Sequence, residues 1–284
     1  MSVPVSVVIP TKNEEANLRR CLESLSWASQ IFVVDSQSVD RTVQIAEEFG
    51  ATVVQFRYGG GWPKKKNWAL ENLPFANEWV LLLDADEVLM PGGWEEIDLV
   101  TRSSNGVMGY WINRHFFFLG KRLKHSYYPN WNLRLFKHAA GRFERLVNSE
   151  TASGDVEIHE HVVVKGLTGR LRTELEHYAF PSVESFIEKH NRYSNWEARF
   201  QLESDLSQPA LQNKRVSLRR KLKRLSHRLP LRPLLRFLYI YFWQGGFLDG
   251  KAGYYFAQLH ACYEWMSVVK VYELKQDANR RLGN

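Results

Sequence analysis

Cysteines and long apolar runs are scarce in this sequence of 284 residues. The two cysteines, Cys21 and Cys262, lie far apart and provide neither a disulfide framework nor the close ligand spacing of a zinc site. Such a chain suits a reducing cytosol. No run of about 18 apolar residues is present, so we expect no membrane-spanning helix. An apolar alternation over residues 3–9 follows the first Met without a basic segment, which predicts that no signal peptide is present.

Acidic residues are absent between Leu206 and Leu248, a stretch rich in arginine and lysine. Its cationic residues are Lys214, Arg215, Arg219, Arg220, Lys221, Lys223, Arg224, Arg228, Arg232 and Arg236. The chain has 38 Lys and Arg against 31 Asp and Glu, a net charge of +7. This excess favours an anionic partner, whether a nucleotide, a phospholipid, a phosphorylated glycan or a nucleic acid.

Short β-branched runs alternate with amphipathic stretches in the first third of the chain. The predicted strands are residues 5–9, 31–34, 52–55 and 79–83, and the predicted helices between them are residues 14–25 and 40–49. This order predicts an α/β fold with a mostly parallel sheet and helices on both faces. Because such sheets bind ligands beyond the carboxyl ends of their strands, the residues that follow each strand are the first candidates for a site.

Two aspartates, Asp84 and Asp86, follow the fourth predicted strand. In an extended segment, residues two apart project to the same side, so both carboxylates can face a cleft while Ala85 points away. A hard divalent cation held there, Mg²⁺ or Mn²⁺, would neutralise the diphosphate of a nucleotide sugar. The structural alternative is that these residues only form a turn or cap the helix near Trp94.

Polar residues at other strand ends have two interpretations. Asp35 can recognise a base or ribose, or it can accept local backbone N–H groups. Thr11 can line a nucleoside pocket together with Asn13 and Glu14, or it can cap the following helix.

A run of lysines at residues 64–66 and Asn67 follows a glycine-rich stretch. Lys66 and Asn67 can contact phosphate or sugar, although a lysine run at a helix start is usually a solvated face.

Four segments together, in this order and spacing, resemble glycosyltransferase family 2. They are Val7-Val8-Ile9-Pro10-Thr11-Lys12-Asn13-Glu14, Val33-Val34-Asp35-Ser36-Gln37-Ser38-Val39-Asp40-Arg41-Thr42, Lys66-Asn67-Trp68-Ala69-Leu70 and Leu83-Asp84-Ala85-Asp86-Glu87. The resemblance implies a GT-A fold, a UDP-linked donor sugar and inversion at the anomeric carbon. It implies donor-binding roles for Pro10, Thr11, Asn13, Glu14, Asp35, Ser38, Lys66, Asn67, Asp84, Ala85 and Asp86. Within that set, Asp35 would contact uracil, Asp84 the ribose or metal, and Asp86 the metal.

Later motifs resemble the branch that contains bacterial lipopolysaccharide-core β-glucosyltransferases, which favours glucose. These motifs are Pro129-Asn130-Trp131-Asn132-Leu133-Arg134-Leu135-Phe136, Ile158-His159-Glu160-His161, Leu175-Glu176-His177-Tyr178 and Asn191-Arg192-Tyr193-Ser194. The branch places a His-Glu pair on the acceptor side, so Glu160 is the predicted general base. Trp131, Arg134 and His159 are expected on the acceptor side. A zinc site at residues 159–161 is not expected, because the His-Glu-x-x-His pattern is absent.

The predicted organisation is a catalytic domain over residues 1–180, with a nucleotide-sugar half (1–95) and an acceptor half of mixed strands (96–180), followed by a helical basic and aromatic region over 181–284. Cations of the 214–236 cluster, followed by Tyr239, Tyr241, Phe242 and Trp243, predict peripheral attachment to an anionic membrane surface on the cytoplasmic face of the inner membrane. In the alternative, the basic helix is solvated and the aromatic residues pack in the core or a dimer interface.

Other functions compete with transfer to a glycan or lipid-linked acceptor. A polyprenyl-phosphate acceptor would also need a membrane-facing site. A nucleotidyltransferase would use the same metal chemistry on a nucleoside triphosphate. A nucleic-acid-binding protein would leave the strand-end carboxylates unexplained, and no nucleic-acid partner is expected.

Overall fold

The structure is a computed structural model that describes residues 2–145, 161–206 and 231–282. These residues form two compact units. The first unit contains residues 2–122, 128–145 and 161–179, and the second contains residues 123–127, 180–206 and 231–282.

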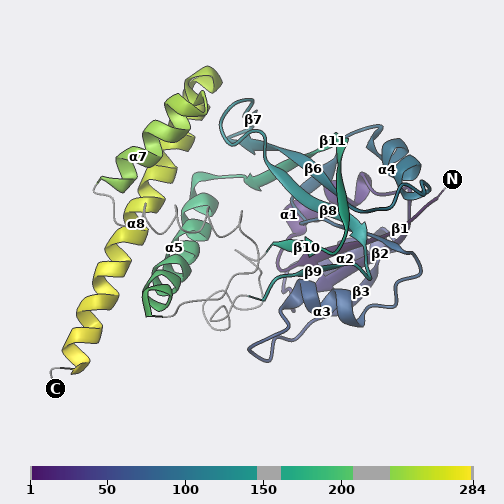
Figure 1. Ribbon diagram of the computed structural model, residues 1–284, viewed down its shortest axis with the longest axis horizontal. Coiled ribbons are helices and arrows are strands. Elements are labelled where there is room, and N and C mark those ends of the chain that lie inside the picture. Colours follow the sequence, from purple (N-terminus) through teal and green to yellow (C-terminus); the bar gives the residue numbers. More distant parts are fainter. Residues whose placement is uncertain (1, 146–160, 207–230, 283–284) are drawn as a thin grey trace. The chain divides into compact units, whose positions relative to one another are not determined.

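The first unit alternates strands with helices and then continues with strands (Figure 1). Its elements are β1 (Val3–Thr11), α1 (Glu15–Glu23), β2 (Ala28–Asp35), α2 (Thr42–Glu48), β3 (Thr52–Gln55), α3 (Lys65–Asn72), β4 (Trp79–Leu82), β5 (Glu87–Leu89), α4 (Gly93–Thr101), β6 (Val107–Phe118), β7 (Lys121–Arg122), β8 (Trp131–Lys137), β9 (Gly141–Phe143), β10 (Val162–Val164) and β11 (Leu167–Phe180). All four predicted strands of the first third are present, and β3 has the predicted bounds.

The main sheet has the strand order β3-β2-β1-β4-β8-β6-β11-β5, with β7 paired to β6. Strand β1 pairs in parallel with β2 and β4, so Val7 lies between Ile31 and Leu81. From β4 onward the sheet is mixed, because β8 runs antiparallel to both β4 and β6. Strand β11 runs antiparallel to β5 and places His177 opposite Glu87. The expected α/β fold of the GT-A type, with mixed strands after the parallel half, is confirmed.

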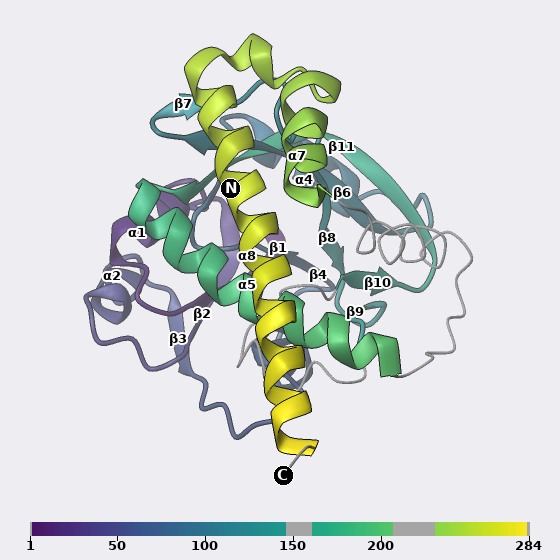
Figure 2. The same ribbon diagram turned by 90° about the vertical axis from the view of Figure 1, so that its left-hand side faces the viewer.

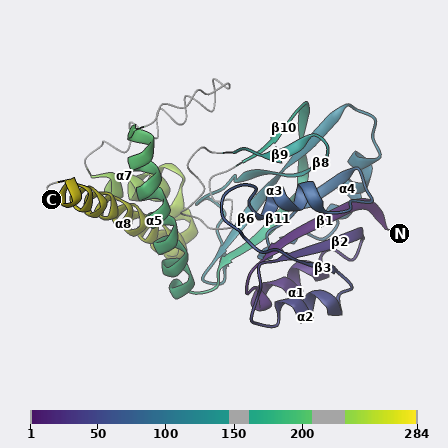
Figure 3. The same ribbon diagram turned by 90° about the horizontal axis from the view of Figure 1, so that it is seen from below.

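Both faces of the parallel half are buried, as its continuous apolar strands require. On one face, Val7 and Ile9 join Leu18 of α1 and Ile45 of α2 in one apolar cluster. On the other face, Val8 joins a second cluster that includes Leu70 of α3. Figure 3 shows α1 and α2 on one side of β1–β3 and α3 on the opposite side. This packing fixes the strand ends that carry the candidate site.

The second unit is helical, as expected for the C-terminal region. It contains α5 (Val183–Leu206), α7 (Arg232–Leu238), the π-helix η1 (Tyr239–Trp243), the 3-10 helix η2 (Gly246–Asp249) and α8 (Gly250–Leu282). Figure 2 shows α8 running beside both α5 and α7. Among the described residues, no helix is both long and apolar enough to cross a membrane. Most of the basic cluster, from Lys214 to Arg228, lies outside the described residues.

Backbone caps and an ion pair hold the second unit together. The carboxylate of Asp249 accepts the backbone N–H groups of Lys124, His125 and Ser126 at 2.8, 3.2 and 2.7 Å. The guanidinium of Arg232 on α7 lies 2.7 Å from the carboxylate of Glu264 on α8. The short segment 123–127 therefore belongs with the helices, although it sits within the predicted acceptor half.

Candidate active site

The segment from Asp84 to Glu87 is a turn that joins β4 to β5. The backbone N–H of Glu87 donates to the carbonyl of Asp84 (2.9 Å), and the backbone N–H of Asp84 donates to Oε2 of Glu87 (2.9 Å). The prediction that Asp84 and Asp86 lie on one extended segment is therefore wrong. The reason is Glu87, whose side chain folds back on the chain and closes the turn. Ala85 is buried inside it.

Asp84 lies between two cations. Its Oδ1 accepts a hydrogen bond from Nζ of Lys66 at 2.8 Å, and its Oδ2 lies 2.5 Å from Nη2 of Arg134. Burial raises the pKa of the Asp84 carboxyl, but the charges of Arg134 and Lys66 outweigh it and hold that pKa well below its usual range. Asp84 is therefore a carboxylate at neutral pH.

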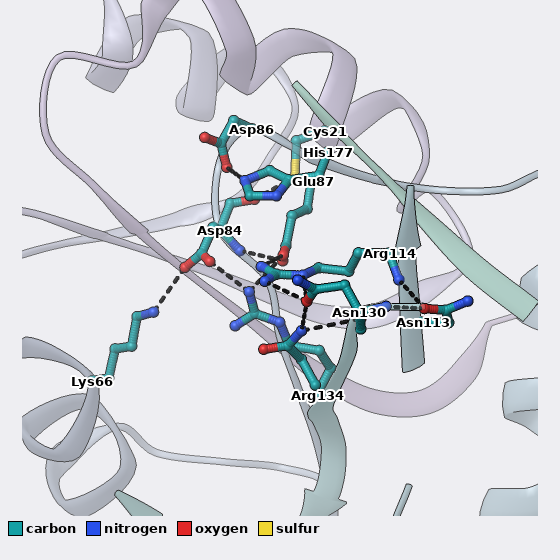
Figure 4. A network of polar contacts seen from close by, with 11 residues as sticks. Cys21, Lys66, Asp84, Asp86, Glu87, Asn113, Arg114, Asn130, Arg134 and His177 are labelled. Carbon is teal, nitrogen blue, oxygen red and sulfur yellow. Dashed lines mark hydrogen bonds and ion pairs between the residues drawn. The ribbon is translucent and has the colours of Figure 1, made fainter. Parts of the chain in front are cut away.

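Glu87 is a fully buried carboxylate held by two arginines. Its Oε1 lies 2.8 Å from Nη1 of Arg114 and 2.5 Å from Nη2 of Arg134. Arg114 is oriented in turn by Oδ1 of Asn130, at 2.9 Å from Nη2. Figure 4 shows these side chains converging from β6, β8 and the β4–β5 turn. A buried charge of this kind is stable only when it is paired and hydrogen-bonded.

Asp86 lies beside a histidine. Its side chain is largely buried, and Oδ1 lies 3.3 Å from Nε2 of His177 on β11. A carboxylate oxygen and an imidazole nitrogen this close can bind one divalent cation, with the remaining positions filled by water and substrate oxygens. The donor set therefore fits a catalytic metal. No group of three or more His, Cys, Asp or Glu suited to a metal occurs within residues 2–145, 161–206 and 231–282, so a closed structural metal site is not formed there.

Asp35 ends β2 and is fully buried. Its Oδ1 accepts hydrogen bonds from the hydroxyls of Thr11 (3.1 Å) and Ser38. Its Oδ2 accepts the backbone N–H of Ser38 (2.8 Å) and Nε2 of Gln55 (3.0 Å). The carboxylate therefore ties the end of β1 and the loop after β2 to β3. Of these donors, the backbone N–H of Ser38 is of the local kind that the structural alternative expected, and recognition of a base or ribose by Asp35 stays a prediction.

The loop after β1 is fastened to the loop after β2. Asn13 has a left-handed backbone (φ 54°), and its N–H donates to Oγ of Ser38 at 2.8 Å. The N–H of Glu14 donates to Oγ1 of Thr42, also at 2.8 Å. Helix α1 begins at Glu15 with Glu14 at its N-cap position, so Thr11 does not cap it and belongs to β1. Pro10 lies next to Thr11 in the same strand.

The three lysines at the start of α3 are buried, so the alternative of a solvated lysine face is wrong. Nζ of Lys65 donates to the carbonyl of Thr11 at 2.9 Å, and Nζ of Lys66 reaches Asp84. The side chain of Asn67 exchanges two hydrogen bonds with the backbone of Phe143, at 3.0 and 2.9 Å. Lys66 therefore lies in the site, while Asn67 joins α3 to β9.

The acceptor-side residues are only partly within the described chain. Trp131 is half-buried on β8, with the guanidinium of Arg170 4.8 Å from its ring centre. Arg134 lies at the centre of the carboxylate group. Glu160 and His159 lie outside the described residues. The role of Glu160 as general base therefore stays a prediction.

Three side chains of this site were assigned no role from the sequence: Glu87, Arg114 and His177. Glu87 and His177 stand inside motifs that carry the family resemblance, and this was the available signal. No such signal existed for Arg114, because its neighbours in the sequence are the aromatic residues of a strand and belong to none of the family motifs.

The carboxyl edge of the sheet carries acidic and basic side chains, and sequence comparison identifies the family. Residues 6–153 match the model of Glycosyl transferase family 2, which is just over half of the chain. The chain belongs to this family and is a glycosyltransferase. This decides against the nucleotidyltransferase and nucleic-acid-binding alternatives.

Similar proteins cover most of the chain. The lipopolysaccharide core biosynthesis glycosyltransferase LpsC of Rhizobium meliloti is 28% identical over 281 residues, which is 95% of this chain and 93% of that protein. An uncharacterized glycosyltransferase of Rickettsia typhi is 32% identical over 199 residues, which is 69% of this chain and 67% of that protein.

Solved structures are more distant. S. aureus TarS gives a TM-score of 0.41 at 18% identity, over 72% of this chain and 39% of that chain. Glucosyl-3-phosphoglycerate synthase from Mycobacterium tuberculosis, in complex with Mn²⁺, UDP and glucosyl-3-phosphoglycerate, gives 0.32 at 22% identity, over 40% of this chain and 44% of that chain.

Proposed function

We propose that this glycosyltransferase transfers a hexose, with glucose favoured, from a UDP-sugar to a glycan or lipid-linked acceptor of the lipopolysaccharide core or a related cell-envelope glycan. The acceptor class is supported by the similarity to LpsC, which extends over 95% of the chain. The observation that supports the chemistry most directly is the turn after β4, where Asp84 is paired with cations and Asp86 faces His177.

Asp86 and His177 are the residues that we propose to hold Mn²⁺ or Mg²⁺. A bound divalent cation would neutralise the charge that develops on the departing diphosphate. The imidazole favours Mn²⁺, because Mg²⁺ takes oxygen ligands almost exclusively. Both oxygens of Asp84 are already bonded to cations, so we assign Asp84 a secondary part in metal binding or a contact to the ribose.

Lys66 and Arg134 place two positive charges beside the same turn. We propose that Lys66, whose Nζ lies 2.8 Å from Oδ1 of Asp84, also reaches toward a donor phosphate. Arg134 is held by two carboxylates at 2.5 Å and would keep the turn in place. Asp35 would act on the nucleoside through the loops that it holds, or contact uracil directly after its hydrogen bonds rearrange.

The acceptor half of the reaction rests on Glu160 as general base. In an inverting displacement the base removes the proton of the acceptor hydroxyl. The acceptor oxygen then bonds to the anomeric carbon on one face as the bond to UDP breaks on the other. Trp131 offers an aromatic ring on which a sugar could stack, and Trp131 and His159 remain acceptor-side proposals.

The direct test measures UDP release by the purified full chain with a panel of UDP-sugars, using a deacylated lipopolysaccharide core oligosaccharide or a polyprenyl phosphate as acceptor. We expect UDP release with UDP-glucose that requires the oligosaccharide. Asp86→Asn should reduce it by about a thousandfold. Transfer only to polyprenyl phosphate, or only from a non-uridine donor, would overturn the corresponding part of the proposal. Full activity in excess chelator would overturn the metal-assisted mechanism.

A further inference from the structure

Large apolar side chains are exposed along one side of α7 and through the turn that follows it. We call this surface the apolar ridge, and it comprises Leu234, Leu238, Phe242, Trp243, Phe247 and Leu248. Trp243 is 84% exposed, Leu248 59% and Phe242 58%. Leu234 and Leu238 are four residues apart on α7, which places them on one stripe of that helix, and Phe242 and Trp243 follow in η1. The backbone that carries the ridge runs from α7 through a turn into α8 (Figure 1). Large apolar side chains that are exposed close together in this way mark an interaction surface.

The opposite side of the same segment is packed, so the ridge is presented by a folded hairpin. Ile240 is fully buried, and the ring of Tyr241 lies 5.3 Å from that of Phe237 and 5.8 Å from that of Tyr254 on α8. The hairpin closes where Gly253 meets the backbone of Gly246, because a Cβ on Gly253 would lie 2.0 Å from the carbonyl oxygen of Gly246. The fold therefore buries Ile240 and packs Tyr241 on the inner side of the hairpin, while the ridge residues stay exposed on its outer side.

The surface around the ridge carries no exposed negative charge over residues 231–263, all of which the structure describes. The one carboxylate in this stretch belongs to Asp249. Its side chain is 3% exposed and accepts hydrogen bonds from the backbone N–H groups of residues 124–126. Lys124 and Lys251 are exposed. The surface therefore combines apolar and aromatic side chains with cations.

We propose that the apolar ridge inserts into the headgroup region of an anionic lipid bilayer. Aromatic side chains such as Trp243 and Phe242 prefer this depth, and exposed lysines beside them are attracted to anionic headgroups. A protein partner of matching shape would be expected to meet exposed acids as well as bases at its rim, and residues 231–263 expose no carboxylate. The described helices cannot span the bilayer, so the contact is shallow. Unlike attachment through the 214–236 cluster alone, it depends mainly on apolar burial. The inference rests on the exposed ridge and does not require the proposed sugar transfer.

Vesicle flotation with the full chain tests the proposal. The vesicles are phosphatidylcholine alone, or phosphatidylcholine with about 30 mol % phosphatidylglycerol. We expect binding to the anionic vesicles, and the fraction that persists in about 0.5 M NaCl should come from the ridge. The double variant F242S/W243S should lower the partition coefficient at least tenfold, since about two large apolar side chains no longer enter the lipid. The matched control L99S/L167S removes two side chains that are 72% and 68% exposed in the first unit, and it should float like the wild type.

Three results would overturn the proposal. In the first, the wild type binds neither kind of vesicle. In the second, F242S/W243S floats as well as the wild type, and in the third, salt abolishes wild-type binding completely. A change from dimer to monomer in F242S/W243S, with vesicle binding unchanged, would assign the ridge to a second copy of the chain. Circular dichroism and UDP binding should be unchanged in F242S/W243S, because its positions lie in the second unit. The assay contains no donor sugar, so its failure leaves the proposed transfer reaction standing.

Discussion

Nη2 of Arg134 lies 2.5 Å from Oδ2 of Asp84, so one of the two carboxylates predicted to hold a metal is already bonded to a cation. This separates the functions of the two aspartates. Asp84 is part of a charge-paired framework, while Asp86, beside His177, is the carboxylate that we propose as a ligand of a divalent ion. We therefore propose that Asp84 is mainly a structural residue and Asp86 mainly a chemical one.

Replacing Arg134 with Ala should weaken both the fold and the reaction. Loss of the guanidinium leaves buried Glu87 with Arg114 alone, and breaking a buried pair costs about 3 kcal/mol. We expect this loss in urea unfolding. Arg134→Lys should recover part of the stability but raise the KM for the donor, since one ammonium cannot hold both carboxylates. Arg102→Ala, which removes an exposed arginine paired with Asp98, is the control and should change neither quantity. An Arg134→Ala enzyme with wild-type stability and KM would contradict the framework role.

Replacing His177 with Ala should weaken metal binding more than it weakens the fold. Its Nε2 is within 3.3 Å of Asp86, and loss of one ligand or its supporting partner usually costs 10- to 100-fold in metal affinity, as an order-of-magnitude guide. Titration with Mn²⁺ followed by electron paramagnetic resonance measures this directly, in the presence of UDP. His138→Ala, a histidine that packs against Phe75, serves as the control. Unchanged Mn²⁺ affinity in His177→Ala would remove His177 from the metal site.

Glu160→Gln should separate binding from chemistry. An amide keeps the size of the side chain but cannot accept the acceptor proton, so we expect UDP binding near wild type and transfer reduced by about 10² to 10⁴. Isothermal titration with UDP and a product assay measure the two effects. Near-normal turnover would remove Glu160 from the role of base.

The second unit should lose stability in mild acid through His190. Burial, followed by the charges of Lys189 and Arg236, lowers the pKa of His190 to about 4, and its ring is stacked on Phe186 with His260 and Tyr263 around it. The unfolded chain binds this proton near pH 6.5 and the folded one only near pH 4, so stability is highest above pH 6.5 and falls as the pH drops toward 4. Between pH values above 6.5 and below 4, protonation of His190 lowers the free energy of unfolding by about 3 kcal/mol in total. Urea unfolding of wild type and His190→Phe at pH 7 and pH 4.5 measures it, and an equal pH dependence in both would contradict the assignment.

Removing the carboxylate of Asp249 should loosen the second unit. Burial raises the pKa of Asp249, but the N–H groups of Ser126 and Lys124 outweigh it and lower that pKa, so the group is ionised in the folded protein. Asp249→Ala leaves three backbone donors without their acceptor and should cost about 3 kcal/mol. The control is Asp277→Ala, at an exposed position on α8, the helix that follows Asp249. It should lower the free energy of unfolding by under about 0.5 kcal/mol in the same urea titration.

The parallel half of the fold was predictable because its signals are local. The apolar alternation within β1 predicts a strand, and the glycine after α2 predicts the end of a helix, from a few neighbouring residues each. The polar residues that follow the strands are equally local in the sequence. The acidic turn itself was placed correctly, but its shape was not, because it depends on the side chain of Glu87 returning to the N–H of Asp84.

The rest of the site depends on strand pairings that join residues far apart in sequence. His177 reaches Asp86 only because β11 runs antiparallel to β5, and Arg114 reaches Glu87 only because β6 and β8 follow β4 across the sheet. The lysines of α3 illustrate the same limit. Lysine composition predicts exposure, yet Lys65 and Lys66 are buried because acceptors on β1 and after β4 meet their ammonium groups.

The pairing of buried charges described above has a consequence for the order of ligand binding. Asp84, Asp86 and Glu87 carry three formal negative charges and Lys66, Arg114 and Arg134 three formal positive ones, so the formal charges of these six side chains sum to zero. A divalent cation alone would leave a positive excess, and a nucleotide diphosphate alone would leave a negative one. We therefore expect each to bind more tightly when the other is present, which would couple the two ligands thermodynamically through these paired charges.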